Sequence, residues 1–109
     1  MAIRGTEVID ADGLAATYYA ASGGGDKVSP GPGQGIHVKN GSGSSINVTL
    51  VTPGVVENDL AIADRVVAVP AGADRFISVP EIYRNSADNF ADLTWSATTT
   101  VTFAVLRIN

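Results

Sequence analysis

Apolar and polar residues alternate on both sides of a short glycine- and serine-rich cluster in the middle of the chain. The alternation covers residues 36–38 and 46–50, and the cluster at 40–44 reads Asn-Gly-Ser-Gly-Ser. Because side chains on a strand change face at every residue, each run has one face for a core and one for water. Asn, Gly and Ser suit tight turns and bond to their own backbone. The stretch 35–53 therefore predicts a β-hairpin.

Further short strands are predicted where apolar and β-branched residues run up to Gly, Pro or polar turn residues. They cover residues 65–70, 75–80, 93–96 and 100–108. Residues 14–21 are ambiguous, because alanine favours a helix and the Thr-Tyr-Tyr run favours a strand. The surrounding β pattern favours a strand there. Residues 81–92 are interpreted as a loop with room for a helical turn.

The remaining segments define the organisation of the chain. A chain of 109 residues corresponds to one domain. Residues 1–12 are interpreted as an N-terminal arm or an edge strand, and residues 13–109 as a single β-sandwich domain. Within that domain, residues 22–35 form a loop rich in Gly and Pro, in which little regular structure is expected.

These patterns predict an all-β protein, a small antiparallel β-sandwich or jelly-roll-like barrel of about six to eight short strands. The core is expected to come from the inward positions of the strands. Those positions are Ile36, Val38, Val48, Leu50, Val67, Val69, Ile77, Trp95, Phe103 and Val105.

Composition narrows the classes of function. The net charge of −4 argues against a nucleic-acid partner, which would require a basic surface. The absence of cysteine excludes disulfides and thiolate chemistry. No apolar stretch is long enough to cross a bilayer, so we expect no membrane partner. The first residues do not resemble a secretory signal, so the product is expected to act where it is made.

The candidate chemistry is sparse. His37 is the single histidine and falls on an outward strand position, which predicts a solvated side chain. The aspartates lie in or beside predicted turns, where Asp is common for structural reasons. A hydrolase that uses His37 or a pair of aspartates is a weak alternative, because no activating partner is visible. We therefore expect no catalytic residues, no metal, no cofactor and no enzyme activity.

Aromatic residues leave a second alternative open. Tyr18 and Tyr19 are interpreted as one core and one rim residue, because tyrosine has an apolar body and a polar tip. Together with Trp95, however, they are also compatible with a carbohydrate-binding β-sandwich module.

A small module without chemistry of its own acts through its surface. The arm and the Gly-rich loop are the segments least needed for a core, and each could become ordered on binding. The sequence thus assigns a partner interface to the apolar and basic positions of the arm. These are Ile3, Arg4, Val8 and Ile9.

Several segments resemble small virion structural proteins of tailed bacteriophages, in particular the small head proteins encoded near the major capsid gene. They are Asp26-Lys-Val, the run from His37 to Thr49, Val67-Ala-Val-Pro-Ala-Gly, and Val101-Thr-Phe-Ala-Val-Leu-Arg-Ile. The resemblance extends from about Gly13 to the end of the chain.

The resemblance implies a capsid decoration protein that binds the outer surface of the phage head and stabilises it. Its partner would be the major capsid protein, its own copies would form homotrimers at symmetry axes, and its location would be the virion surface after synthesis in the host cytoplasm. No catalytic residues come with the resemblance. A head–tail joining or tail-associated virion protein is the nearest alternative.

Overall fold

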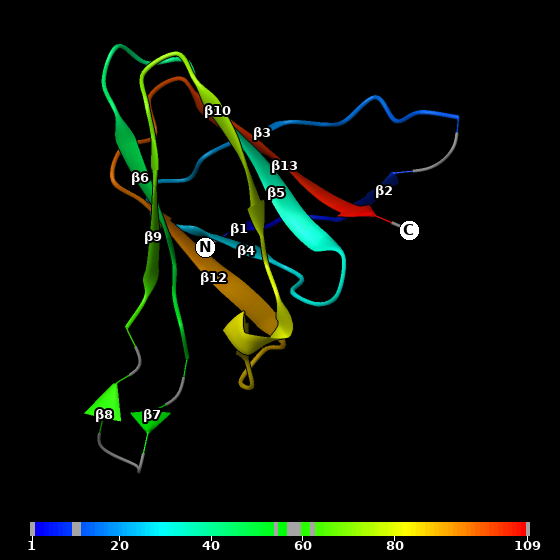
Figure 1. The fold of residues 1–109 in the computed structure, drawn as a ribbon, viewed down its shortest axis with the longest axis vertical. Helices are drawn as coiled ribbons and strands as arrows, with labels where there is room; N and C mark the ends of the chain where they lie inside the picture. Colours follow the sequence, from blue (N-terminus) through cyan, green and yellow to red (C-terminus); the bar gives the residue numbers. More distant parts are fainter. Residues whose placement is uncertain (1, 10–11, 54, 57–59, 62, 109) are drawn as a thin grey trace.

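A computed structural model describes residues 2–9, 12–53, 55–56, 60–61 and 63–108, and its fold is an all-β sandwich (Figure 1). The prediction of an all-β sandwich is therefore confirmed. Within the described residues, six strands have five residues or more, and the other strands have two or three. In the part of the chain that the structure describes, the one helical element is the 3-10 turn η1 (Glu81–Tyr83), inside the segment interpreted as a loop with a helical turn.

The first sheet has the strand order β1-β4-β12-β6-β9, and β11 pairs with β12. Its strands are β1 (Ala2–Ile3), β4 (Asp26–Val28), β6 (Ile46–Leu50), β9 (Arg65–Val69), β11 (Arg84–Asn85) and β12 (Phe90–Trp95). The second sheet has the order β10-β5-β13-β2, and β3 pairs with β13. Its strands are β2 (Glu7–Ile9), β3 (Tyr19–Ala20), β5 (Gln34–Asn40), β10 (Asp74–Ser78) and β13 (Val101–Ile108).

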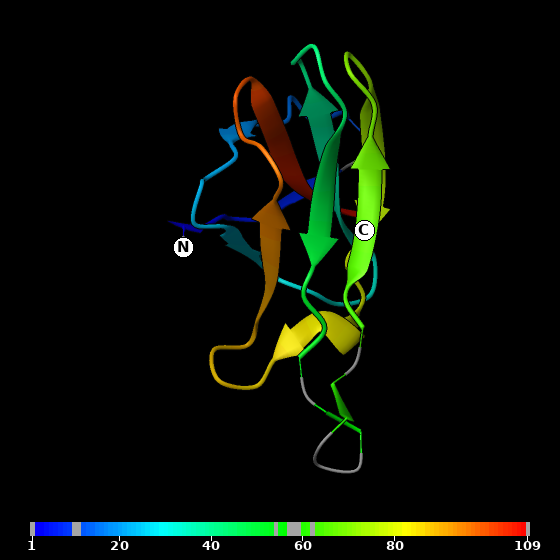
Figure 2. The same cartoon turned by 90° about the vertical axis from the view of Figure 1, so that its left-hand side faces the viewer.

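Most neighbouring strands are antiparallel. The parallel pairs among the described residues are β1 with β4 and β2 with β13, so both strands of the N-terminal arm add to sheets in parallel. A small separate hairpin of β7 (Val55–Val56) and β8 (Leu60–Ala61) lies at the bottom of Figure 1. Figure 2 shows the two sheets in a view turned by 90°.

The core lies between the sheets and comes from alternate strand positions, as period-two patterning requires. Of the predicted core residues, Ile36, Val38, Val48, Leu50, Val69, Ile77, Phe103 and Val105 are buried. Val67 and Trp95 are partly buried and pack against this core. The structure adds Val28, Val79, Tyr83, Leu93 and Val101, which border turns or predicted loops.

The predicted β-hairpin at 35–53 is wrong in its pairing, although both strands and the turn are present. β5 pairs with β10 and β13, whereas β6 pairs with β9 and β12. The turn therefore carries the chain from one sheet to the other, as a β-arch. In the arch the apolar faces of β5 and β6 lie opposite each other across the core, whereas in a hairpin they would lie side by side in one sheet. The strands that flank β5 and β6 decide between the two arrangements.

A second arch, between β9 and β10, lies beside the first at the top of Figure 1. Asn40 joins the two arches and is 2% exposed. Its Nδ2 donates to the carbonyl oxygens of Ser44 (2.8 Å), Val69 (3.0 Å) and Pro70 (3.2 Å). Its Oδ1 accepts from the backbone N–H and the hydroxyl of Ser42.

Other local expectations need correction. Only Tyr19–Ala20 of the predicted strand at 14–21 is a strand. The Gly/Pro-rich segment 22–35 contains β4, in which Asp26 and Val28 are both buried. The high glycine content of the segment is the reason why the sequence pattern does not predict this strand. The arm does form edge strands, since β1 and β2 each pair at the border of a different sheet.

Candidate interaction face

The face of the second sheet that points away from the core carries the candidate site. Because Ile36 and Val105 point inward, the alternate residues His37, Ala104 and Leu106 point outward. The strand register places Phe76 of β10 beside His37, and His37 beside Ala104. We call this surface the outer face of the second sheet.

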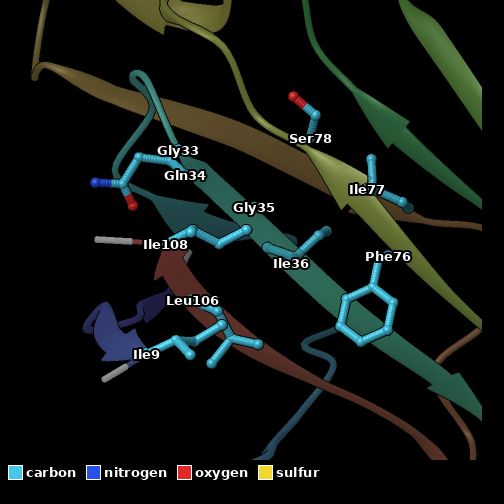
Figure 3. Close-up of a pocket in the computed structure, with 10 residues that line it drawn as sticks. All are labelled: Ile9, Gly33, Gln34, Gly35, Ile36, Phe76, Ile77, Ser78, Leu106 and Ile108. Atoms are coloured by element: carbon cyan, nitrogen blue, oxygen red, sulfur yellow. The ribbon is translucent and has the colours of Figure 1, made fainter. Parts of the chain in front are cut away.

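An apolar groove of about 390 Å³ lies on this outer face. Figure 3 shows it crossing β5 at Gly35, with Phe76 on one side and Ile9, Leu106 and Ile108 on the other. Phe76 is 76% exposed and Ile108 is 72% exposed, which is unusual for such large apolar side chains. Contiguous apolar surface of this kind is typical of a contact site for another molecule.

Two polar side chains border the groove. Gln34 and Ser78 are among the lining residues, and the buried Oε1 atom of Gln34 has no hydrogen-bond partner among the described residues. An unpaired buried acceptor costs free energy, and this atom is shielded from solvent. The groove therefore combines a mainly apolar contact area with two polar side chains at its border.

A chain of polar contacts lies next to the groove. The hydroxyl of Tyr18 is 2.7 Å from Nδ1 of His37, and Nε2 of His37 is 3.1 Å from Oδ2 of Asp74. A carboxylate only accepts, so Nε2 carries the hydrogen, and in the neutral ring Nδ1 accepts from Tyr18. The ring of Phe76 stacks on His37 with centroids 4.0 Å apart. The amine of Lys39 lies 4.2 Å from the centre of the Tyr18 ring.

The prediction of a solvated His37 is wrong, because the residue is only 7% exposed. It does point outward from the sheet, as the alternation requires. However, Phe76 covers one face of the ring, and Tyr18 and Asp74 occupy both nitrogens. No sequence pattern indicates these partners, which come from β10 and from the segment before β3. These contacts hold the ring of His37 in place.

The four predicted interface residues of the arm do not form one patch. Ile3 is 61% exposed on β1, at the border of the first sheet. Val8 and Ile9 lie on β2, at the border of the second sheet, and Ile9 alone of the four lines the groove. Arg4 lies between the two strands and is turned into the molecule.

Arg4 belongs to a buried polar network that sequence reasoning missed. Its Nε donates to Oδ1 of Asp26 at 3.1 Å, and its Nη2 donates to Ser22. Asp26 is fully buried and also accepts from the indole N–H of Trp95 at 2.8 Å and from Ser22. Arg4 thus fastens the arm to the sandwich. No local sequence pattern predicts the pair of Arg4 and Asp26, because the two residues are 22 positions apart in the chain.

The aromatic side chains considered for sugar stacking are used within the fold. The rings of Tyr19 and Trp95 pack on the core residue Phe103, with centroids 6.1 and 5.0 Å away. Tyr18 bonds to His37. The three rings therefore do not make a common platform on the surface.

Ion pairs at the other end of the first sheet shift several pKa values. Hydrogen bonds to Asp88 and Asp92 raise the pKa of Lys27 above its ordinary value of 10.5. The hydrogen bond from Lys27 lowers the pKa of Asp88. In the pair of Glu81 with Arg84, the hydrogen bond from Arg84 lowers the pKa of Glu81. The contacts of Lys27 connect β4 with β12 and the turn before it, and the pair of Glu81 with Arg84 connects η1 with β11.

Within the described ranges, no group of three or more His, Asp or Glu side chains is placed to bind a metal ion. Asp10, one of the aspartates in or beside the predicted turns, lies outside the described residues. No helix in the described part of the chain is long and apolar enough to span a membrane. Comparison with protein families, with curated proteins and with solved structures found no match.

Proposed function

We propose that this chain is a non-enzymatic virion structural protein, a capsid decoration protein that binds the outer surface of a tailed-phage head and stabilises it. Its partner is the major capsid protein. The resemblance of its β4, β5–β6, β9 and β13 segments to small phage head proteins supports this function. The observation that carries it is the exposed apolar groove of the outer face.

The groove suits docking onto a large fixed surface better than capture of a small ligand. It is shallow, it is lined by strand side chains, and Phe76 projects from its border. A decoration protein binds as many copies on one particle, so modest contacts add up through avidity. Trimers of the kind that the resemblance implies would present several grooves to the head at once.

Binding to purified heads that lack this protein tests the proposal. We expect the chain to cosediment with such heads in a stoichiometric copy number and to raise their resistance to heat. Leu106→Asp places a charge in the groove and should weaken binding about ten- to a hundredfold, the effect of losing one buried leucine contact. Asn47→Asp on the exposed side of β6 carries the same charge change and should bind normally.

Two results would contradict the proposal. One is a folded chain that does not bind to heads at all. The other is equal binding by the Leu106→Asp and Asn47→Asp variants, which would remove the groove from the contact. Recovery of the chain with tails only, and not with heads, would instead favour the tail-associated alternative.

A further inference from the structure

β10 forms an open edge of the second sheet. It pairs with β5 and, among the described residues, with no other strand. At its ends, Asn40 donates to the carbonyl of Ala73 (2.9 Å) and Val79 donates to the carbonyl of Gln34 (3.0 Å). Because antiparallel ladders alternate, the backbone groups of residues 74, 76 and 78 point away from β5.

The protection of this edge is limited to two charged residues, Asp74 and Arg75. Residues 74–78 contain no proline, and their register with β5 is continuous, without a bulge. The one covering contact comes from Arg75, whose Nη1 donates to the carbonyl of Asp74. Arg75 is exposed and can turn away from that carbonyl. Phe76, at the centre of the strand, is the most exposed of the large apolar side chains described.

The edge is complementary to itself in one register. A two-fold axis through Phe76, perpendicular to the sheet, opposes Phe76 to its own copy and Asp74 to Ser78 of the second copy. All of these residues point their backbone groups outward, so the pairing forms about six hydrogen bonds, two for each opposed pair. On the outer face, the carboxylate of Asp74 meets the hydroxyl of Ser78, and the two phenyl rings form a cross-strand aromatic pair.

Neighbouring registers lack this match. An axis through Arg75 would oppose the carboxylate of Asp74 to the ring of Phe76. An axis through Ile77 would oppose Asp74 to Pro80, which has no N–H to donate. Stacking on His37 also holds Phe76 in place, which lowers the entropy lost when the ring pairs.

We propose that two copies of this chain join through β10, antiparallel and centred on Phe76, so that the second sheet continues across a two-fold axis. The pairing goes beyond the proposed function and does not depend on it. It sets the two apolar grooves on one continuous face. It also keeps β2, at the opposite border of the sheet, outside the interface.

Sedimentation equilibrium of the purified chain, without phage heads, tests the pairing over a series of concentrations. We expect a monomer–dimer equilibrium. Ser78→Asp places a carboxylate opposite Asp74 at both ends of the interface and should weaken the dimer about tenfold, whereas Ser78→Lys should tighten it by a similar factor. Asn47→Asp and Asn47→Lys change the net charge equally on the other sheet and should leave the equilibrium unchanged.

Cross-linking tests the register directly, because the natural chain has no cysteine. Opposed residues in a hydrogen-bonded antiparallel pair have Cα atoms about 5.5 Å apart, within the range of a disulfide. Phe76→Cys should therefore oxidise to a covalent dimer much faster than Asn47→Cys. Circular dichroism and urea unfolding establish that each variant is folded.

Any of three results overturns the pairing: a natural chain that stays monomeric throughout the series, Ser78 variants that behave like their Asn47 counterparts, or equal oxidation of the two cysteine variants. Head binding reports separately on the proposed function. A monomeric chain that still binds to heads removes only the pairing. A dimeric chain that ignores heads removes only the decoration role.

Discussion

At the scale of single residues, Asp26 has the strongest structural role. It is fully buried and accepts hydrogen bonds from Arg4, Ser22 and Trp95. Arg4 belongs to the arm, Ser22 to the turn before β4, and Trp95 to β12. A buried carboxylate is tolerated only when it is paired and hydrogen-bonded, and this one is both. The network therefore adds side-chain hydrogen bonds to the strand pairing that holds the arm.

Replacing Asp26 should be among the most damaging single changes. Asp26→Ala leaves the guanidinium of Arg4 and the indole N–H of Trp95 without their acceptor, so we expect a loss of about 3–5 kcal/mol in the free energy of unfolding. Urea titration followed by the fluorescence of Trp95 measures it. Asp64→Ala removes an exposed carboxylate that accepts one backbone bond and should cost much less. Equal losses would show that the network contributes nothing beyond an ordinary surface carboxylate.

The same scale shows where sequence reasoning reaches its limit. The alternation along β5 correctly predicts that His37 points away from the core. It cannot predict burial, because Phe76, Tyr18 and Asp74 come from distant segments and meet the ring only in the fold. The sequence does not predict the exposed groove for the same reason, because each of its lining residues is ordinary within its own segment.

At the scale of elements, strands were predictable and their partners were not. The period-two pattern locates β5, β6, β9, β10 and most of β13, since it depends only on local alternation. Hairpin and arch share that pattern and share Gly-rich turns. They differ in whether the two apolar faces lie side by side or opposite each other, which only the other strands decide. Asn40 stabilises the arched arrangement, because its side-chain amide donates to the carbonyl of Ser44 in the first arch and to the carbonyl of Val69 in the second.

Asn40→Ala should therefore weaken both arches together. The change leaves the carbonyls of Ser44, Val69 and Pro70 without their amide donor, and a single hydrogen bond contributes about 1 kcal/mol. We expect a loss of at least about 2 kcal/mol in the free energy of unfolding, measured by urea titration, together with faster amide exchange in β9 and β10. Asn47→Ala, on an exposed position of β6, is the matched control. If the two substitutions have the same effect, the link between the arches is not a source of stability.

At the scale of the whole molecule, the two sheets leave the chain with one consolidated core and one unusual surface. The core was predictable from alternation, since eight of the ten residues proposed for it are buried. The surface was not, because the arm residues chosen as an interface are divided between the two sheets. Ile9 alone connects that choice with the groove. Ion pairs between distant segments are likewise a property of the fold, and they determine how stability responds to pH.

Stability should be greatest on a plateau between the acidic and the basic limits. The pKa of Asp88 and that of Glu81 are lowered in the fold by hydrogen bonds from Lys27 and Arg84, so these contacts stabilise the protein above the ordinary values of 3.8 and 4.5. That stabilisation is lost as the pH falls through the lowered values. The pKa of Lys27 is raised above 10.5, so its contribution is complete below that pH and is lost as the pH rises through the raised value.

Urea titrations across the pH range, followed by Trp95 fluorescence, measure both limbs of this profile. Lys27→Met removes the partner that Asp88 and Asp92 share, so the acidic limb should become shallower and the contribution of Lys27 to the basic limb should vanish. Arg107→Met removes a cation from an exposed position of β13 and should leave the shape of the profile unchanged. The ion pairs would have no part in the pH response if the Lys27→Met profile kept the shape of the natural protein's.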